Sequence, residues 1–477
     1  MRGVRDLRFA ICDLRFATER RRSATSAVRS LPSVLLLLLL VAPARAQHDP
    51  HKTLLRNGIT VITKEVHTSH VLAVNLFVRG GASLDPPEQP GLANFVQRML
   101  LRGTARRSGD QVRAPIEAIG GTLDARAEYD YSLLYTLSSA DALDTALDVL
   151  ADVFRNPRFE PEEIEKERQQ ILDTLTELDE EPAWIVQESL SGLLYPSGPY
   201  AHATPGTPEA VKGIRRADLV AFHRRYYTPE NLIVVVVGNI DRAGAEAHVT
   251  KVLGDMPRSG RAPVGLPAPA ASGLPEARPS LVVKERPGSL AHMGIAFPMD
   301  GIRREEYPAI MVMNALLGGG MGSRLMQEAR ERYGIAYAVT TVYSHRAGGN
   351  HLGVYLSFEP IRPVFGLGGP FGTEMVVNKA KEAILGQFDW VRDHPVADRE
   401  LVRARNFAAG SFVRDHQRTL NQARYLGWFE LLGLGYQYDD ELPRAIDRVT
   451  KEDLRSLARR YFGRYALSLV MPKPTPE

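Results

Sequence analysis

Apolar and polar residues follow one another along this chain in patterns that predict both strands and helices. Apolar runs bounded by turn-forming residues favour strands, and the expected strands are 54–61, 71–78, 131–137, 233–237 and 467–471. Apolar residues at three- and four-residue steps favour helices, and the expected helices are 91–104, 141–155, 161–179, 218–227 and 453–462. The helix over 161–179 is densely charged, which is typical of a solvated face with paired acidic and basic side chains.

The end of the chain repeats a pattern from its middle. Asp218–Tyr227 and Asp453–Phe462 are both predicted helices that end in two aromatic residues at identical spacing, and a buried strand follows each. Such self-similarity over a long period indicates a duplicated unit. The sequence therefore predicts an α+β fold with two tandem homologous domains, each an antiparallel sheet packed with helices.

A proline-rich segment separates the two predicted domains. Residues 257–281 hold six prolines among Ala and Gly, a composition that resists both helix and strand and acts as a semi-rigid spacer. The expected regions are a signal peptide over 1–46, an N-terminal domain over 47–256, a linker over 257–281 and a C-terminal domain over 282–477.

The first 46 residues have the features of an export signal. Arginines at 20–22 and 29 precede an apolar run over 34–42, and Ala44-Arg45-Ala46 fits a small-x-small cleavage site. Because the apolar run is too short to span a bilayer comfortably, no membrane span is expected after cleavage. We expect the mature chain to be periplasmic or secreted.

Cysteine content and charge narrow the class of protein. The only cysteine, Cys12, lies in the leader, so the mature chain must be held by ordinary hydrophobic cores instead of disulfides. The formal net charge of +3 includes the arginine-rich leader. The sequence has no basic patch interleaved with aromatic residues, so nucleic acid is not an expected partner.

The helix over 91–104 carries the most specific signal. Its sequence is Gly-Leu-Ala-Asn-Phe-Val-Gln-Arg-Met-Leu-Leu-Arg-Gly-Thr. It resembles the zinc-binding helix of the pitrilysin/insulinase family of metallopeptidases, whose signature is Gly-Leu-Ala-His-x-x-Glu-His-Met-x-x-x-Gly-Thr. In that family the two His residues hold zinc, and the Glu between them takes a proton from the metal-bound water. Here the three positions are Asn94, Arg98 and Gln97.

These replacements remove the chemistry of the site. An amide oxygen is a poor zinc donor, and Gln97 has no titratable oxygen with which to act as a base. Arg98 has no lone pair to offer and stays charged, so it repels a divalent cation. The family's last ligand is a Glu in a Glu-x-x-x-x-x-x-Glu pattern. The resemblance places the first Glu at Glu167 and the ligand position at Thr174. We expect no metal in this chain and zinc in a partner subunit.

A second part of the resemblance lies in the C-terminal domain. Ser323-Arg324-Leu325, Arg330, Gly334 and Tyr337 match the family segment Ser-Arg-Leu-x-x-x-x-Arg-x-x-x-Gly-x-x-Tyr. The resemblance implies that Arg330 and Tyr337 reach toward the substrate beside the zinc. A guanidinium and a phenol can hold a peptide carbonyl and the oxyanion that develops from it. The alternative is an Arg on a helix surface and a Tyr that starts a strand.

A triple glycine, Gly318, Gly319 and Gly320, precedes this segment. Glycines before a helix can cradle phosphate, but neither the Lys-Ser/Thr of a P-loop nor a dinucleotide spacing follows. The glycines favour a flexible loop at a helix start, and the resemblance assigns this loop to substrate binding.

The resemblance covers essentially the whole mature chain and carries two further expectations. In relatives the strand at 131–137 is a sheet edge to which a peptide adds by backbone pairing, although an ordinary internal strand fits the pattern equally well. Asp124 stands where relatives commonly carry Asn. The stretch 359–372, with three prolines and four glycines, favours a loop where relatives pass directly into a helix.

Some relatives divide labour between a chain that carries the zinc motif and a chain that lacks it. We therefore expect a non-catalytic subunit of an exported heteromeric zinc peptidase, forming half of a clamshell with a homologous partner that has an intact His-x-x-Glu-His, and acting on peptides. The alternative is a peptide-binding or scaffold protein of the cell envelope. A new kind of enzyme, for which the close pair His67 and His70 would be the candidate residues, is the least favoured reading.

Overall fold

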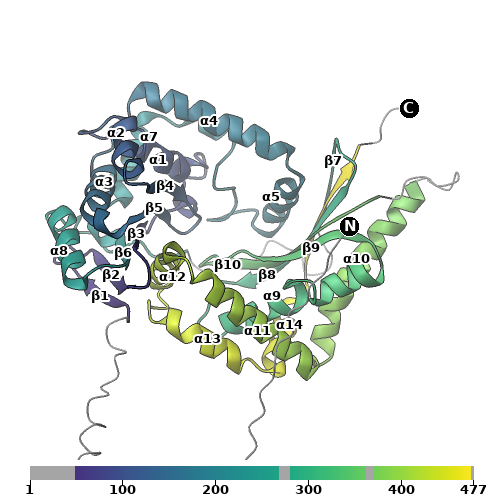
Figure 1. Ribbon diagram of the computed structural model, residues 1–477. Helices are drawn as coiled ribbons and strands as arrows, with labels where there is room; N and C mark the ends of the chain where they lie inside the picture. Colours follow the sequence, from purple (N-terminus) through teal and green to yellow (C-terminus); the bar gives the residue numbers. More distant parts are fainter. Residues whose placement is uncertain (1–48, 268–279, 361–369, 474–477) are drawn as a thin grey trace, which may run out of the picture. The chain divides into compact units, whose positions relative to one another are not determined.

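Two β-sheets and the helices packed on them make up the described part of the chain, which comprises residues 49–267, 280–360 and 370–473 of the computed structural model (Figure 1). The strands are β1 (His51–Leu54), β2 (Thr60–Glu65), β3 (Val71–Val78), β4 (Thr122–Ala127), β5 (Ser132–Ser139), β6 (Leu232–Gly238), β7 (Ser280–Arg286), β8 (Ala291–Asp300), β9 (Ala336–Tyr343), β10 (Gly349–Phe358) and β11 (Ala466–Pro472).

The helices connect and cover these strands. The α-helices are α1 (Leu92–Leu100), α2 (Gly109–Glu117), α3 (Leu143–Arg155), α4 (Pro161–Glu180), α5 (Pro182–Leu194), α6 (Pro208–Gly213), α7 (Arg216–Tyr226), α8 (Arg242–Leu253), α9 (Tyr307–Gly318), α10 (Pro370–Asp393), α11 (Asp398–Asp415), α12 (Thr419–Leu431), α13 (Tyr438–Arg448) and α14 (Lys451–Tyr461). The short segments are the 3₁₀ helices η1 (Ala82–Leu84), η2 (Ala140–Ala142) and η3 (Pro229–Asn231) and the π-helix η4 (Met326–Arg332).

Both sheets have the same strand order. The first sheet runs β1-β2-β6-β3-β5-β4, and the second runs β7-β11-β8-β10-β9. When β7 is matched to β2, the strands β11, β8, β10 and β9 fall on β6, β3, β5 and β4 in turn. The pairs β2–β6 and β7–β11 are parallel, and the other pairs are antiparallel. The predicted duplication of an α+β domain is confirmed, and each sheet is antiparallel except for one parallel pair.

Helix α1 begins at a position that requires glycine. Gly91 has a φ of 96°, and a Cβ there would lie 2.6 Å from the carbonyl oxygen of Pro205. The Asp85 carboxylate accepts hydrogen bonds of 2.8 Å from the backbone N–H groups of Gly91 and Ala93, which satisfies donors of the first turn. The start of α1, and with it the direction of every side chain on the helix, is therefore fixed.

Each sheet is covered by a helix from the other half of the chain. Helix α5 lies against β8 and β11, while α12 lies against β3 and β6 (Figure 1). Both contacts are close: a Cβ at Gly294 would lie 2.3 Å from the Val186 side chain, and a Cβ at Gly427 would lie 2.1 Å from the Phe77 ring. The Phe77 ring is fully buried. The two halves therefore cannot separate without exposing core residues of both sheets.

One expectation for the first sheet is wrong. The strand predicted at 131–137 is β5, which pairs with β3 on one side and with β4 on the other. It is an internal strand, as the alternative reading held, and β4 is the edge strand. Strand β4 is not among the expected strands, because Asp124 and Arg126 interrupt its apolar pattern and it is only partly buried.

Some predicted segments lie outside the described residues. They are the leader over 1–46, the centre of the linker at 268–279 and the loop centre at 361–369. The described part of the linker, 257–267, forms neither helix nor strand, and β7 begins at Ser280. The domain limits stay predictions. Within the described ranges, no helix is both long enough and apolar enough to cross a bilayer.

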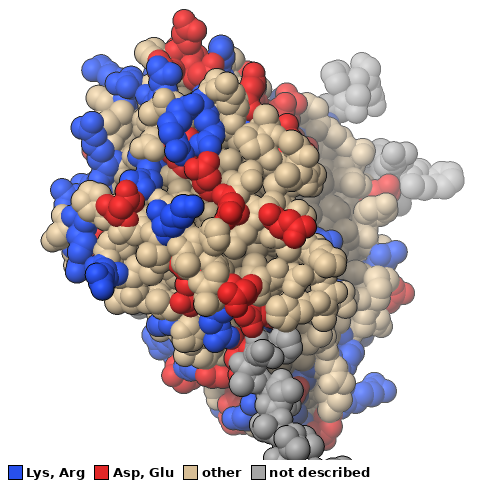
Figure 2. Space-filling model, turned by 60° about the vertical axis from the view of Figure 1, so that its left-hand side comes forward, with Lys and Arg blue, Asp and Glu red and all other residues tan. Residues whose placement is uncertain are grey.

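The charged surface carries both signs. Figure 2 shows one face of the molecule, on which Lys and Arg side chains and Asp and Glu side chains lie close to one another. This mixture matches the near balance of 59 basic and 56 acidic residues in the whole sequence. On this face the Lys and Arg side chains are most numerous toward the left-hand side of the view, with Asp and Glu side chains between and beside them.

Gly427→Ala tests the contact between α12 and the first sheet. The added methyl group overlaps the buried Phe77 ring, so we expect the free energy of unfolding to fall by about 1–3 kcal/mol. Gly410→Ala in α11 is the matched control, since a Cβ there meets nothing within 4 Å, and it should stabilise the chain by up to about 1 kcal/mol. Urea unfolding measures both, and equal stabilities for the two variants would contradict the packing described here.

Candidate functional site

Helices α1 and α4 pack together and carry the positions at which the resemblance places zinc chemistry. Asn94, Gln97 and Arg98 lie on α1, and Glu167 and Thr174 lie two turns apart on α4. The register derived from the sequence therefore puts all of these positions on one helix pair.

The Gln97 amide is fully engaged by the protein. Its side chain is buried, its Nε2 donates a 2.7 Å hydrogen bond to the carbonyl of Leu133 on β5, and its Oε1 accepts a 2.5 Å bond from the Tyr227 hydroxyl. Burial raises the pKa of Tyr227, so its phenol stays a donor. Gln97 thus ties α1 to β5 and to the end of α7, a structural role at the position of the family's general base.

A buried carboxylate lies where the two helices meet, and two guanidinium groups hold it. The Nε groups of Arg98 and Arg102 donate to the two carboxylate oxygens of Glu167. The Glu167 side chain is only 2 % exposed, whereas those of Arg98 and Arg102 are 31 % and 30 % exposed. A carboxylate this buried requires a charged partner. The ion pairs therefore link α1 to α4 in the region where the family uses a metal.

The remaining positions do not complete a metal site. Thr174 donates its hydroxyl to the backbone carbonyl of Gln170, one turn earlier, at 2.8 Å. Asn94 offers an amide and Arg98 a guanidinium, and neither supplies the neutral imidazole nitrogen that zinc prefers in this geometry. Among the described residues, no group of three or more His, Cys, Asp or Glu side chains is placed to hold a metal ion. The residues present do not fit zinc.

The predicted substrate pair lies on adjoining elements of the second domain. Arg330 is on the π-helix η4, and Tyr337 is near the start of β9, against which η4 packs. Tyr337 is 77 % exposed and the Arg330 side chain 47 % exposed. The nearest carboxylate to Arg330 is its neighbour Glu331, with Nε and Oε1 4.0 Å apart. Both polar groups face solvent, and no hydrogen bond joins them to each other within the described chain.

The three glycines serve packing in this structure. Gly318 is the last residue of α9, and a Cβ on it would lie 2.1 Å from the Thr341 hydroxyl on β9. Gly320 has a φ of 74°, a left-handed conformation that favours glycine. The glycines follow one helix and precede the next, so the loop lies where the sequence predicted it. Its role in substrate binding stays a prediction.

The two close histidines interact with the same amide. Nδ1 of His67 lies 2.7 Å from Oδ1 of Asn239, and Nδ1 of His70 lies 3.4 Å from Nδ2 of the same residue. This is an arrangement of a loop at the end of β6, and it offers no set of ligands for a metal.

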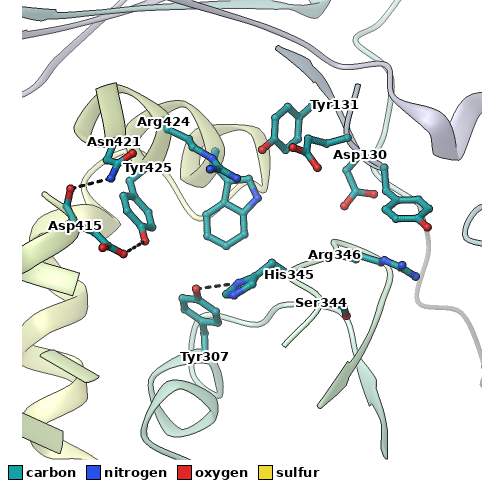
Figure 3. Close-up of a pocket in the computed structure, with 13 residues that line it drawn as sticks. Asp130, Tyr131, Tyr307, Ser344, His345, Arg346, Asp415, Asn421, Arg424 and Tyr425 are labelled. Carbon is teal, nitrogen blue, oxygen red and sulfur yellow. Dashed lines mark hydrogen bonds between the residues drawn. The ribbon is translucent and has the colours of Figure 1, made fainter. Parts of the chain in front are cut away.

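Sequence reasoning missed two features. Arg102 lies just beyond the end of α1, and its pairing with Glu167 depends on how α1 and α4 pack together. The second feature is a cavity lined by the turn Glu128–Tyr131 and by residues of the second domain (Figure 3). Its walls come from segments more than 170 residues apart, so the only sequence signal was the alternation of acidic and tyrosine residues in that turn.

A duplicated α+β fold with its metal positions on one helix pair defines a chain built like a zinc metallopeptidase. Family models agree: residues 60–207 match the model described as insulinase, peptidase family M16, and residues 213–407 match the one described as the peptidase M16 inactive domain. The two models together cover well over half of the chain, which belongs to the insulinase family.

Individual relatives are similar over nearly their whole length. A protein of Mycobacterium tuberculosis named as a zinc protease is 28 % identical over 89 % of this chain and 93 % of its own. One of Bacillus subtilis is 26 % identical over 87 % and 97 %. Among solved structures, a peptidase M16 inactive domain from Pseudomonas fluorescens aligns with a TM-score of 0.78 at 23 % identity, covering 90 % of this chain and 99 % of that one. A protease from Helicobacter pylori aligns at 0.79 and 17 %, covering 89 % and 100 %.

A double-mutant cycle tests the ion pairs at Glu167. Arg98→Ala or Arg102→Ala alone leaves one guanidinium on the carboxylate, and each should lower the free energy of unfolding by about 1 kcal/mol. Removing both leaves a buried carboxylate without a partner, so the double variant should lose about 3–5 kcal/mol.

The control is Arg56→Ala, an exposed position that forms no ion pair within the described residues, where a change within about 0.5 kcal/mol is expected. Denaturant unfolding of all four variants measures the cycle. Strict additivity of the two arginine substitutions would mean that Glu167 does not depend on them jointly.

Proposed function

We propose that this chain is the zinc-less subunit of an exported heteromeric metallopeptidase, and that it supplies Arg330, Tyr337 and part of a peptide-binding chamber to a homologous subunit with an intact His-x-x-Glu-His. The observation that carries the proposal is the ion pair of Arg98 with the buried Glu167. A guanidinium fixed at a zinc-ligand position opposes a divalent cation, so this chain needs another source of the metal to take part in hydrolysis.

The exposure of Arg330 and Tyr337 supports a role between subunits. Tyrosine exposed to 77 % on a strand has no packing role that would explain it, and its neighbour Arg330 faces solvent as well. In a two-chain enzyme the partner's zinc would polarise the scissile carbonyl, while these donors would stabilise the oxyanion from the opposite wall.

The edge of the first sheet supports peptide binding. Strand β4 is the outermost strand after β5, and its far side pairs with no other strand of the described chain. An extended peptide can add to such an edge through backbone hydrogen bonds, which need no particular side chain. Asp124 on β4 already accepts a 2.9 Å hydrogen bond from the Tyr135 hydroxyl, so it is not required for the peptide.

The metal content of the purified mature chain tests the first half of the proposal. We expect no stoichiometric zinc after dialysis and no cleavage of an unstructured peptide, because the positions of the ligands carry Asn94, Arg98 and Thr174. Elemental analysis and a peptide-cleavage assay measure this. About one zinc per chain together with chelator-sensitive cleavage would refute it.

Restoring the ligands sharpens this test. The triple variant Asn94→His, Arg98→His and Thr174→Glu should bind zinc, because two imidazoles and a carboxylate form a three-ligand open site. Gln97 can stay in this variant, since the base is not a ligand and its amide ties α1 to β5. The fourfold variant that also carries Gln97→Glu tests whether peptide hydrolysis returns. We expect its activity to be weak, because the hydrogen bonds around the site do not orient the new ligands and base. A folded triple variant without metal would show that the register of α4 is wrong.

Reconstitution with the partner tests the second half. Arg330→Ala or Tyr337→Phe should each cut the kcat of the pair by about 100- to 1000-fold, the usual cost of losing one oxyanion donor. Subunit association, measured separately by sedimentation, should be nearly unchanged. Arg332→Ala is the matched control, since this exposed neighbour pairs with Glu328 on its own segment. Wild-type turnover from both test variants would favour the peptide-binding or scaffold alternative.

A further inference from the structure

A cavity of about 360 Å³ lies apart from the α1–α4 helix pair and has no role in the function proposed above. Its wall is formed by the turn Glu128–Tyr131 between β4 and β5, the loop Ser344–Arg346 between β9 and β10, Tyr307 of α9 and the face of α12 (Figure 3). Both sheets thus contribute to one enclosure. Its volume falls at the lower end of the range for small-molecule sites.

An acid and a base on this wall are not paired by a hydrogen bond. The Glu128 carboxylate has no hydrogen-bond donor within the described residues, and its burial raises its pKa, an effect that the charge of Arg424 partly offsets. The Arg424 guanidinium interacts with the Tyr131 hydroxyl. Leaving a half-buried carboxylate without a donor costs free energy that a ligand could recover.

The other charged groups of the wall are bonded within the protein or covered by it. Asp130 accepts hydrogen bonds from the Ala347 backbone N–H at 2.7 Å and from the Tyr200 hydroxyl at 2.8 Å. Asp415 accepts from the Tyr425 hydroxyl at 3.4 Å. The Arg346 guanidinium carbon lies 3.9 Å from the centre of the Tyr129 ring, and its Nε and Nη1 are buried without a hydrogen-bond partner and so are closed off from a ligand. Among the described residues, Glu128 thus lacks a hydrogen-bond donor, and Arg424 has the Tyr131 hydroxyl as its neutral partner on this wall.

Aromatic rings border the cavity beside this pair. Trp428 lies on α12 one turn beyond Arg424, and the His345 ring meets it edge to face at a centroid distance of 5.8 Å. His345 has a φ of 52°, a strained conformation for a residue other than glycine, and such strain is often found at binding sites. Desolvation lowers the pKa of His345 to about 4, so its ring is neutral at pH 7. The indole and the imidazole offer an apolar surface.

We propose that this cavity binds a small zwitterion, an α-amino acid or a dipeptide with a large apolar side chain. Its ammonium group pairs with Glu128, its carboxylate with Arg424, and its side chain lies on Trp428. A simple amine would leave the guanidinium without an anion, and a simple carboxylate would leave Glu128 without a donor. Only a ligand with both charges satisfies the two groups together.

Binding of four probes to the wild-type protein tests the charge requirement. Calorimetry should show binding of L-phenylalanine or the dipeptide phenylalanyl-phenylalanine at millimolar concentration or below, and no binding of phenylalanine amide or N-acetylphenylalanine. Equal binding of the amide would define a cation site and overturn the proposal. Equal binding of the acetylated probe would define an anion site and overturn it too, as would the absence of binding by all four.

Substitutions then assign the two charges. Glu128→Gln and Arg424→Gln should each weaken binding of the free ligand by at least about tenfold, the effect of losing one charged hydrogen bond. The matched controls are Glu88→Gln and Arg56→Gln, exposed positions outside the cavity that should leave binding unchanged. Thermal unfolding of each variant reports whether it folds, and the probe series on the wild-type chain decides the question if one does not. Unchanged affinity in both folded test variants would place the ligand elsewhere.

Discussion

The exchange of helices between the two sheets is the contact on which the rest of this structure depends. Helix α5 of the first half covers β8 and β11, and α12 of the second half covers β3 and β6. The closest contact of each helix with its sheet leaves no room for a Cβ, so Gly294 and Gly427 determine how near the helices lie to the sheets. Because a helix from each half of the chain packs on the sheet of the other half, the hydrophobic core is common to both halves. The β4–β5 turn is thereby brought against α12, and the cavity at their junction exists only in the paired arrangement.

The α1–α4 junction lacks the family's metal ligands, and ion pairs hold it together instead. The family keeps an acidic residue at the position of Glu167, and here this carboxylate is buried with two guanidinium groups on it. A buried charge without a partner would cost several kcal/mol, so the arginines at positions 98 and 102 are constrained by Glu167 as much as they constrain it. The same replacement that excludes a cation therefore stabilises the helix pair. Gln97 also stabilises this region, because its side-chain amide donates a hydrogen bond to β5 and accepts one from Tyr227.

The sequence predicted local structure well where one residue pattern decides it. The strand at 71–78 has the limits of β3, and the helix over 91–104 contains α1, because an apolar run and a helical period each depend on neighbours in the chain. The edge position was misassigned, since pairing of β5 with β4 depends on a register that no local pattern specifies. The ion pairs of Glu167 join residues more than sixty positions apart, and the cavity brings Glu128 and Arg424 together from two domains. Charges of this kind find their partners only through the fold. The positions of the lost ligands could therefore be predicted from a local motif, whereas the ion pairs that now occupy the junction could not.

The polar groups that remain exposed on this chain say more about its function than the metal ligands that it lacks. At the α1–α4 junction the polar side chains of Gln97, Arg98 and Glu167 are bonded within the protein, so this region has little left to offer a substrate. Arg330 and Tyr337 are the opposite case: they lie on adjacent elements and face solvent, and the carboxylate beside Arg330 is the exposed neighbour Glu331. Arg330 also lies on a π-helical segment, a type of segment that often marks functional sites. The distribution of satisfied and unsatisfied groups thus favours a chain that completes a site on another subunit.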